Sequence, residues 1–187
     1  DDAHGVGTMG AHGRGTAEHY GCESDVDMLV GTFSKSFACI GGFAAGPAKV
    51  IDYIKHTART MIFSASLPPA AVATVLATLD ILEREPELLQ KTHRAAERAR
   101  KGLADLGFNV GNSEAPIVPV ILGEEMLTFR VWRALFDKGV FTNPVITPAV
   151  PPDGDMLRTS YMATHTDDMI DRALDIFEQV GKQFDLI

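Results

Sequence analysis

One lysine, set among hydroxyl-bearing residues, has the clearest chemical potential in this sequence. Lys35 lies in the segment GTFSKS at residues 31–36, directly after a short apolar run. An amine at the end of a buried strand loses solvation, which favours its neutral form, and a neutral amine can form a Schiff base with an aldehyde. The neighbouring hydroxyls can donate hydrogen bonds to a phosphate. The alternative is an ordinary surface lysine in a loop rich in serine and threonine.

Two polar residues at the start of the chain favour the first interpretation. Asp1 and His4 lie in the stretch DDAHGVG at residues 1–7. A carboxylate aimed at a pyridine nitrogen keeps that nitrogen protonated, so that the ring can act as an electron sink. An imidazole nearby can hydrogen-bond a phenolic oxygen of the same ring. The alternative is that Asp1 caps a turn and that His4 is an ordinary polar residue with a structural partner.

Alternating extended and helical segments are expected to position these side chains. Residues 1–21 hold six of the 17 glycines and are expected to form an irregular loop. The first predicted strand is expected to be buried in a parallel sheet, and the alternation as a whole indicates an α/β fold. Short apolar or glycine-flanked runs predict strands at 28–30, 41–46, 61–63, 117–122, 140–142 and 157–162. Apolar residues at helical spacing predict helices at 47–57, from 68 to an interruption at Pro86, and at 88–106, 128–138 and 167–184.

Composition excludes several classes of protein. The chain has 187 residues, of which 45% are hydrophobic and 22% charged, as is usual for a soluble globular domain. Its formal charge of −8 disfavours a nucleic-acid partner. The two cysteines, Cys22 and Cys39, are too few for a disulfide scaffold or a zinc site, so no metal is expected and a cytoplasmic location fits best. No apolar run reaches the roughly 18 residues that a membrane-spanning helix requires.

Several segments together resemble the α-oxoamine synthase family of pyridoxal-phosphate enzymes, which have fold type I. The similarity rests on residues 1–7, on GAHGRG at 10–15, on residues 31–36 and on GGF at 41–43. The spacing from His4 to Lys35 is the spacing that the family shows. Two later segments, IFSASLPP at 62–69 and LRTS at 157–160, also resemble family segments, so the similarity extends over essentially the whole chain.

This resemblance implies roles for the residues of the N-terminal part. Lys35 would carry pyridoxal phosphate covalently, Asp1 would pair with the pyridinium nitrogen, and His4 would contact the phenolic oxygen. Thr32 and Ser34 would bind the cofactor phosphate.

Two further roles follow from the resemblance. Ser64 would reach the phosphate of the neighbouring subunit's cofactor, because sites in the family lie at a dimer interface. Arg158 would hold the carboxylate of the amino-acid substrate, a role that suits a planar guanidinium because it can bind a carboxylate through two parallel hydrogen bonds. The alternative is that Arg158 is a surface residue of a strand.

The resemblance also implies a domain organisation. Family members are about twice as long as this chain, so the chain is expected to be the rear part of such an enzyme. A partial large cofactor-binding domain is expected at residues 1–67, a connecting helix at 68–86 and a small C-terminal α+β domain at 87–187. The front half would supply early strands of the large domain, a residue that stacks on the cofactor ring and backbone donors to the phosphate.

The implied reaction joins a small amino acid, serine or glycine, to an acyl-CoA with release of CO2. The serine palmitoyltransferase branch is expected first, ahead of the glycine C-acetyltransferase, 8-amino-7-oxononanoate synthase and 5-aminolevulinate synthase branches. The enzyme would be a homodimer without a membrane span. Two other classes stay open: an aminotransferase of the same fold, and a non-catalytic partner subunit, against which the presence of Lys35 argues.

Overall fold

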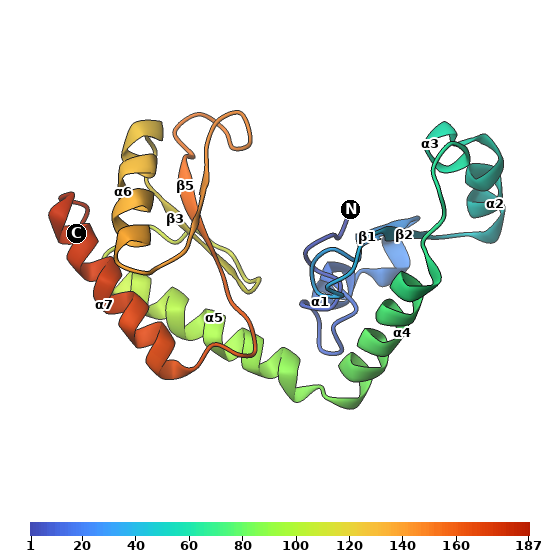
Figure 1. Cartoon of the computed structure of the whole chain (residues 1–187), viewed down its shortest axis with the longest axis horizontal. Helices are drawn as coiled ribbons and strands as arrows, with labels where there is room; N and C mark the ends of the chain where they lie inside the picture. Colours follow the sequence, from blue (N-terminus) through green and yellow to red (C-terminus); the bar gives the residue numbers. More distant parts are fainter. The chain divides into compact units, whose positions relative to one another are not determined.

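The computed structural model describes all 187 residues and divides the chain into two compact units, Asp1–Leu89 and Gln90–Ile187. Figure 1 labels their helices and strands, and each unit is described by itself. The division into a partial large domain, a connecting helix and a small domain stays a prediction. No helix combines the length and the apolar character needed to cross a bilayer.

The first unit is built around two antiparallel strands. β1 and β2 pair with Leu29 opposite Ala45 and Thr32 opposite Gly42. The unit contains α1 (Thr16–Tyr20), the 3-10 helix η1 (Glu23–Asp25), β1 (Leu29–Thr32), β2 (Gly42–Ala45), α2 (Ala48–Thr57), α3 (Arg59–Ile62) and α4 (Pro69–Arg84). The predicted second strand and the helices that begin at Pro47 and Pro68 are confirmed to within a residue or two.

Two predictions for the first unit are wrong, and a third is not tested. β1 pairs antiparallel with β2, because only residues 33–41 join the two strands and a parallel pair requires a much longer crossover. The other edge of β1 has no partner within this chain, so its place in a parallel sheet stays a prediction. Residues 61–63 form no strand; they lie in and after α3, since a short apolar run fits a helical turn as well as a strand. Residues 1–21 are not wholly irregular, because they include α1.

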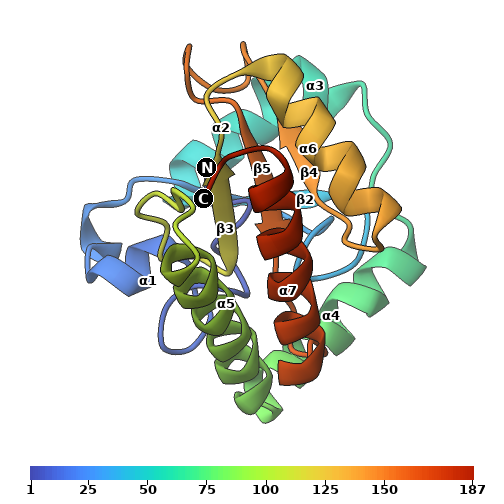
Figure 2. The same ribbon diagram turned by 90° about the vertical axis from the view of Figure 1, so that its left-hand side faces the viewer.

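The second unit packs three helices on one face of a three-stranded antiparallel sheet. Its elements are α5 (Glu87–Asp105), which begins at the boundary between the units, β3 (Ile117–Ile121), α6 (Glu125–Asp137), β4 (Asn143–Val145), β5 (Met156–Ser160) and α7 (Asp167–Gln183). The strand order is β3-β5-β4. Figure 2 shows α5 and α7 side by side in front of β3 and β5. The core between the layers consists of Leu103, Phe108, Val118, Val120, Val131, Leu135, Leu157, Phe177 and Val180.

Because side chains alternate along a strand, the residues between these core positions point to the other face of the sheet. Pro119 lies on that face in β3, which is an edge strand, where a residue without an N–H is tolerated. The strand expected at 140–142 is wrong by three residues. Val140 donates to the Leu135 carbonyl at the end of α6, and the Thr142 carbonyl accepts from Trp132 Nε1, so strand pairing starts at Asn143.

Candidate active site

Lys35 lies in a tightly closed loop between β1 and β2. The loop is closed by hydrogen bonds from Phe33 N to Gly41 O (2.9 Å) and from Cys39 N to Phe33 O (2.7 Å), and Ala38 N donates to Lys35 O (3.0 Å). The Lys35 side chain is exposed, so the burial expected from the sequence is not found within this chain. The reason is that β1 is itself largely unburied: Val30 is 42% exposed. The loop therefore presents an accessible amine on a well-defined backbone.

Two hydroxyls lie together at the start of this loop. Thr32 Oγ1 and Ser34 Oγ are 2.8 Å apart, and Ser34 N donates to Thr32 Oγ1 at 3.2 Å. Thr32 Oγ1 is also within 3.2 Å of Gly41 O, which fixes it against the end of the loop. Hydroxyl groups beside a lysine side chain are suitable donors to a phosphate. The structure thus brings three of the predicted site residues onto one short segment.

The turn that holds Asp1 and His4 is attached to the same segment at two points. Asp2 N donates to Val30 O in β1 (2.8 Å), and Ser36 Oγ, next to Lys35, donates to Val6 O (2.6 Å). The Asp1 carboxylate accepts from Ala3 N and is exposed. The turn and the lysine loop therefore lie against each other although about 30 residues separate them in sequence.

A glycine permits the second of these contacts. Gly7 has a φ of +82°, and a Cβ at this position would lie 2.5 Å from Ser36 Oγ. Both its backbone conformation and the space around it therefore require glycine. The hydroxyl of Ser36 is used in this contact, which distinguishes it from those of Thr32 and Ser34.

Asp2 is a residue of this site that sequence reasoning missed. Its carboxylate accepts from Thr16 N (2.8 Å) and from Thr16 Oγ1 (2.6 Å), which joins the N-terminal turn to α1. A Cβ at Gly5 or Gly15 would lie 2.0 Å from a carboxylate oxygen of Asp2. The close spacing of glycines in this stretch was the available signal, but it does not reveal which side chain fills the space.

Glu18 fixes the glycine-rich loop at residues 10–15. Its carboxylate accepts from the backbone N–H groups of Arg14 (3.0 Å) and His12 (3.2 Å) and contacts the His12 ring. Burial raises the pKa of Glu18, but these hydrogen bonds outweigh it and hold the pKa below its ordinary value. The ionised carboxylate is thus the form that organises the loop.

Ser64 lies outside the lysine loop, on an exposed segment. Its hydroxyl donates to Thr60 O within its own turn. The segment that follows contacts the end of the lysine loop: a Cβ added at Gly41 would lie only 2.4 Å from Leu67 Cδ2. The predicted role of Ser64 toward a second subunit stays a prediction.

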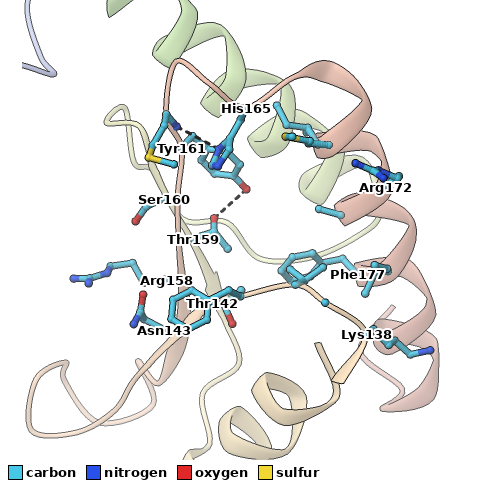
Figure 3. A pocket seen from close by; sticks show the side chains of 18 residues that line it. Lys138, Thr142, Asn143, Arg158, Thr159, Ser160, Tyr161, His165, Arg172 and Phe177 are labelled. Carbon is cyan, nitrogen blue, oxygen red and sulfur yellow. Dashed lines mark hydrogen bonds between the residues drawn. The ribbon is translucent and has the colours of Figure 1, made fainter. Parts of the chain in front are cut away.

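Arg158 belongs to the second unit, on the face of the sheet that the helices leave open. It pairs in register with Pro119 on one side and with Asn143 on the other. Its Nε is buried and has no hydrogen-bond partner. A cavity of about 670 Å³ passes beside it, and no carboxylate lines this cavity. Figure 3 shows Arg158 and Asn143 close together, on the opposite side of β5 from Thr159 and Phe177. The guanidinium is therefore able to bind a carboxylate from outside the chain.

Buried polar contacts hold β5 in place behind Arg158. Thr159, 6% exposed, donates to Val118 O at 2.7 Å, and its Oγ1 lies 3.1 Å from the Tyr161 hydroxyl. Burial raises the pKa of Tyr161, although the contact with Thr159 partly offsets it. A rigid strand backbone gives the Arg158 side chain a defined starting point.

Comparison with known proteins adds to this geometry. The family model described as aminotransferase class I and II matches residues 1–177. A serine palmitoyltransferase of Sphingobacterium spiritivorum is 47% identical over 186 residues, which cover 100% of this chain and 47% of the relative. An 8-amino-7-oxononanoate synthase of Alkaliphilus oremlandii is 40% identical over 187 residues, with the same coverage of each chain.

A solved structure described as "SPT with PLP internal aldimine" superimposes with a TM-score of 0.93 at 34% identity and covers 100% of this chain and 48% of the other. The chain thus spans about half the length of the curated relatives that it matches.

Proposed function

The chain belongs to the aminotransferase class I and II family, in agreement with the resemblance of its motifs to the α-oxoamine synthases. We propose that the intact protein joins a small amino acid to an acyl-CoA and releases CO2 and coenzyme A. Serine is the first expected amino acid. The observation that carries the proposal is the contact between Ser36, next to Lys35, and Val6 in the turn of Asp1 and His4.

The residues present fit pyridoxal phosphate. Lys35 offers an accessible amine, Thr32 and Ser34 offer paired hydroxyls at the start of the same loop, and Asp1 and His4 lie on the turn packed against it. When bound, the cofactor supplies an electron sink that acidifies the α-hydrogen of the amino acid.

The side chains would have distinct tasks in the proposed reaction. Lys35 would hold the cofactor and, once the amino acid has displaced it, would accept the α-proton. Asp1 would retain a proton on the ring nitrogen, and His4 would hydrogen-bond the phenolic oxygen. Thr32 and Ser34 bind the phosphate. The guanidinium of Arg158, free of any acidic neighbour in its cavity, orients the substrate carboxylate.

We propose a homodimer in which Ser64 serves the phosphate of the neighbouring subunit's cofactor. The segment before Ser64 exposes apolar side chains: Met61 is 51%, Ile62 53% and Phe63 85% exposed. Such side chains are stabilised by burial against another protein surface. The two cysteines are free thiols, which suits the proposed cytoplasmic location.

The reaction is tested by product analysis with the intact protein. Carboxyl-labelled L-serine and palmitoyl-CoA are expected to give labelled CO2 and a long-chain aminoketone. Turnover with glycine in place of serine would favour the glycine C-acetyltransferase branch. A keto acid formed without CO2 would contradict the proposal and indicate an aminotransferase.

Replacement of Arg158 by alanine is expected to weaken amino-acid binding by roughly 10- to 100-fold, because a hydrogen bond to a charged group contributes about 1.5–3 kcal/mol. Arg158→Lys should restore binding only in part, since a point charge lacks the planar fork. The measurement is a titration of the cofactor absorbance with amino acid. Arg133→Ala serves as control, because Arg133 lies on α6 and pairs with Asp137. An unchanged dissociation constant for Arg158→Ala would show that the carboxylate binds elsewhere.

A further inference from the structure

Arg158 has two unlike neighbours across the sheet. On the β3 side it faces Pro119, whose ring offers no hydrogen bond, and on the β4 side it faces Asn143. Directly opposed residues of an antiparallel pair have Cβ atoms about 4.5–5.5 Å apart, so both side chains flank the base of the arginine. Asn143 is thus the polar neighbour of the guanidinium in the pairing register.

The Asn143 side chain is available to a ligand. Asn143 is exposed and, like Arg158, lines the cavity beside β5. Figure 3 shows its carboxamide on the same side of β5 as Arg158. The structure gives this carboxamide no hydrogen-bond partner. The buried Nε of Arg158 has none either. The Asn143 carboxamide and the Arg158 guanidinium therefore lie on the same side of β5, and neither the carboxamide nor Nε of the guanidinium is used in a hydrogen bond within the chain.

We propose that Asn143 is a specificity-determining residue that binds the side-chain hydroxyl of serine while Arg158 holds the serine carboxylate. This inference rests on the proposed function. In serine the hydroxyl oxygen is three bonds from the carboxylate carbon. A guanidinium that binds the carboxylate and a polar group directly beside it can therefore contact the two ends of the substrate at once. A carboxamide can donate to a hydroxyl and accept from it. Glycine and alanine lack the hydroxyl and gain nothing from the contact.

Ser160 is the other polar residue on this face, and its position is less suitable. It lies two residues beyond Arg158 on the same strand, and its partner across the sheet is Ile117. Residues i and i+2 of a strand are separated by about 6.5–7 Å along the strand axis, which is farther than the separation across the pair. The geometry therefore favours Asn143 over Ser160.

The test compares amino acids rather than variants alone. In the intact protein carrying its cofactor, the cofactor absorbance is titrated with L-serine, glycine and L-alanine. Asn143→Ala is expected to raise the dissociation constant of serine roughly 3- to 10-fold, the loss of one neutral hydrogen bond, and to change that of glycine and alanine less than about 2-fold. Asn112→Ala, which removes an exposed carboxamide from a loop, is the matched control and should change neither.

A second variant checks the proximity to Arg158. Asn143→Asp keeps the shape of the side chain but places a carboxylate next to the guanidinium, where it competes with the substrate carboxylate. Asn143→Asp is therefore expected to raise the dissociation constants of serine and glycine alike.

Two results would overturn the inference. If Asn143→Ala raised the dissociation constants of serine and glycine equally, Asn143 would support Arg158 and would not bind the hydroxyl. If Asn143→Asp left the dissociation constant of glycine unchanged, the side chains of Asn143 and Arg158 would not act together. If the unsubstituted protein gave no spectral response to any amino acid, the proposed function itself would fail, and this inference with it.

Discussion

Replacing Lys35 by alanine in the intact protein is expected to abolish covalent attachment of pyridoxal phosphate. Turnover is expected to fall by roughly 10²- to 10⁴-fold, the usual contribution of a positioned proton-transfer group, in addition to the loss of the Schiff base. The expectation rests on the closed loop from Phe33 to Gly41, which presents this amine beside the paired hydroxyls of Thr32 and Ser34.

The attachment site can be identified directly. Borohydride reduction followed by digestion should place the cofactor on the peptide that contains Lys35, and the alanine variant should carry no reducible label. Lys49→Ala, on the exposed surface of α2, is the matched control and should retain the label. Label on any other lysine of the unsubstituted protein would contradict the assignment.

The sequence was most informative where chemistry and local structure coincide. Lys35 lies between two short strands bounded by glycines, and these local signals predicted both strands and the loop that joins them. Arg158 was correctly expected on a strand, because the run around Leu157 is apolar and compact. α7 was predicted with its start, since Thr166 caps the helix through a hydrogen bond from Met169 N.

The features that could not be predicted depend on partners distant in sequence. The direction of pairing between β1 and β2 and the exposure of Lys35 are determined by which strands lie beside them, and the residue types around Lys35 do not encode this. The role of Asp2 depends on Thr16, and that of Asn143 depends on the register with Arg158. A shift of one residue in that register would place a different side chain beside the guanidinium.

The Asp1 turn illustrates how such distant contacts serve chemistry. Asp1 itself is held only by Ala3 N, yet its neighbour Asp2 is fixed to both β1 and α1, and Val6 is fixed to Ser36. The carboxylate is therefore placed by contacts of the residues that follow it in the turn, while the Asp1 side chain stays exposed. This arrangement suits a group whose partner is a charged ring nitrogen.

Asp1→Asn in the intact protein is accordingly expected to impair proton removal from the amino acid far more than cofactor binding. A neutral amide cannot retain the proton on the ring nitrogen, so the ring withdraws electrons less strongly. The rate of α-hydrogen exchange is therefore expected to fall by roughly 10²- to 10⁴-fold, the size of effect that is usual for a group that assists proton transfer.

Proton NMR of L-serine in deuterated buffer measures that exchange without requiring an acyl-CoA, and the cofactor dissociation constant is measured on the same samples. Asp27→Asn, on an exposed residue before β1, is the matched control and should exchange at the unsubstituted rate. Asp2→Asn separates position from charge: it weakens the contacts with Thr16, so it is expected to lower the midpoint of thermal unfolding as well as the exchange rate. Exchange in Asp1→Asn at the unsubstituted rate would mean that the ring nitrogen has a different partner, and that Asp1 serves only the turn it shares with Ala3.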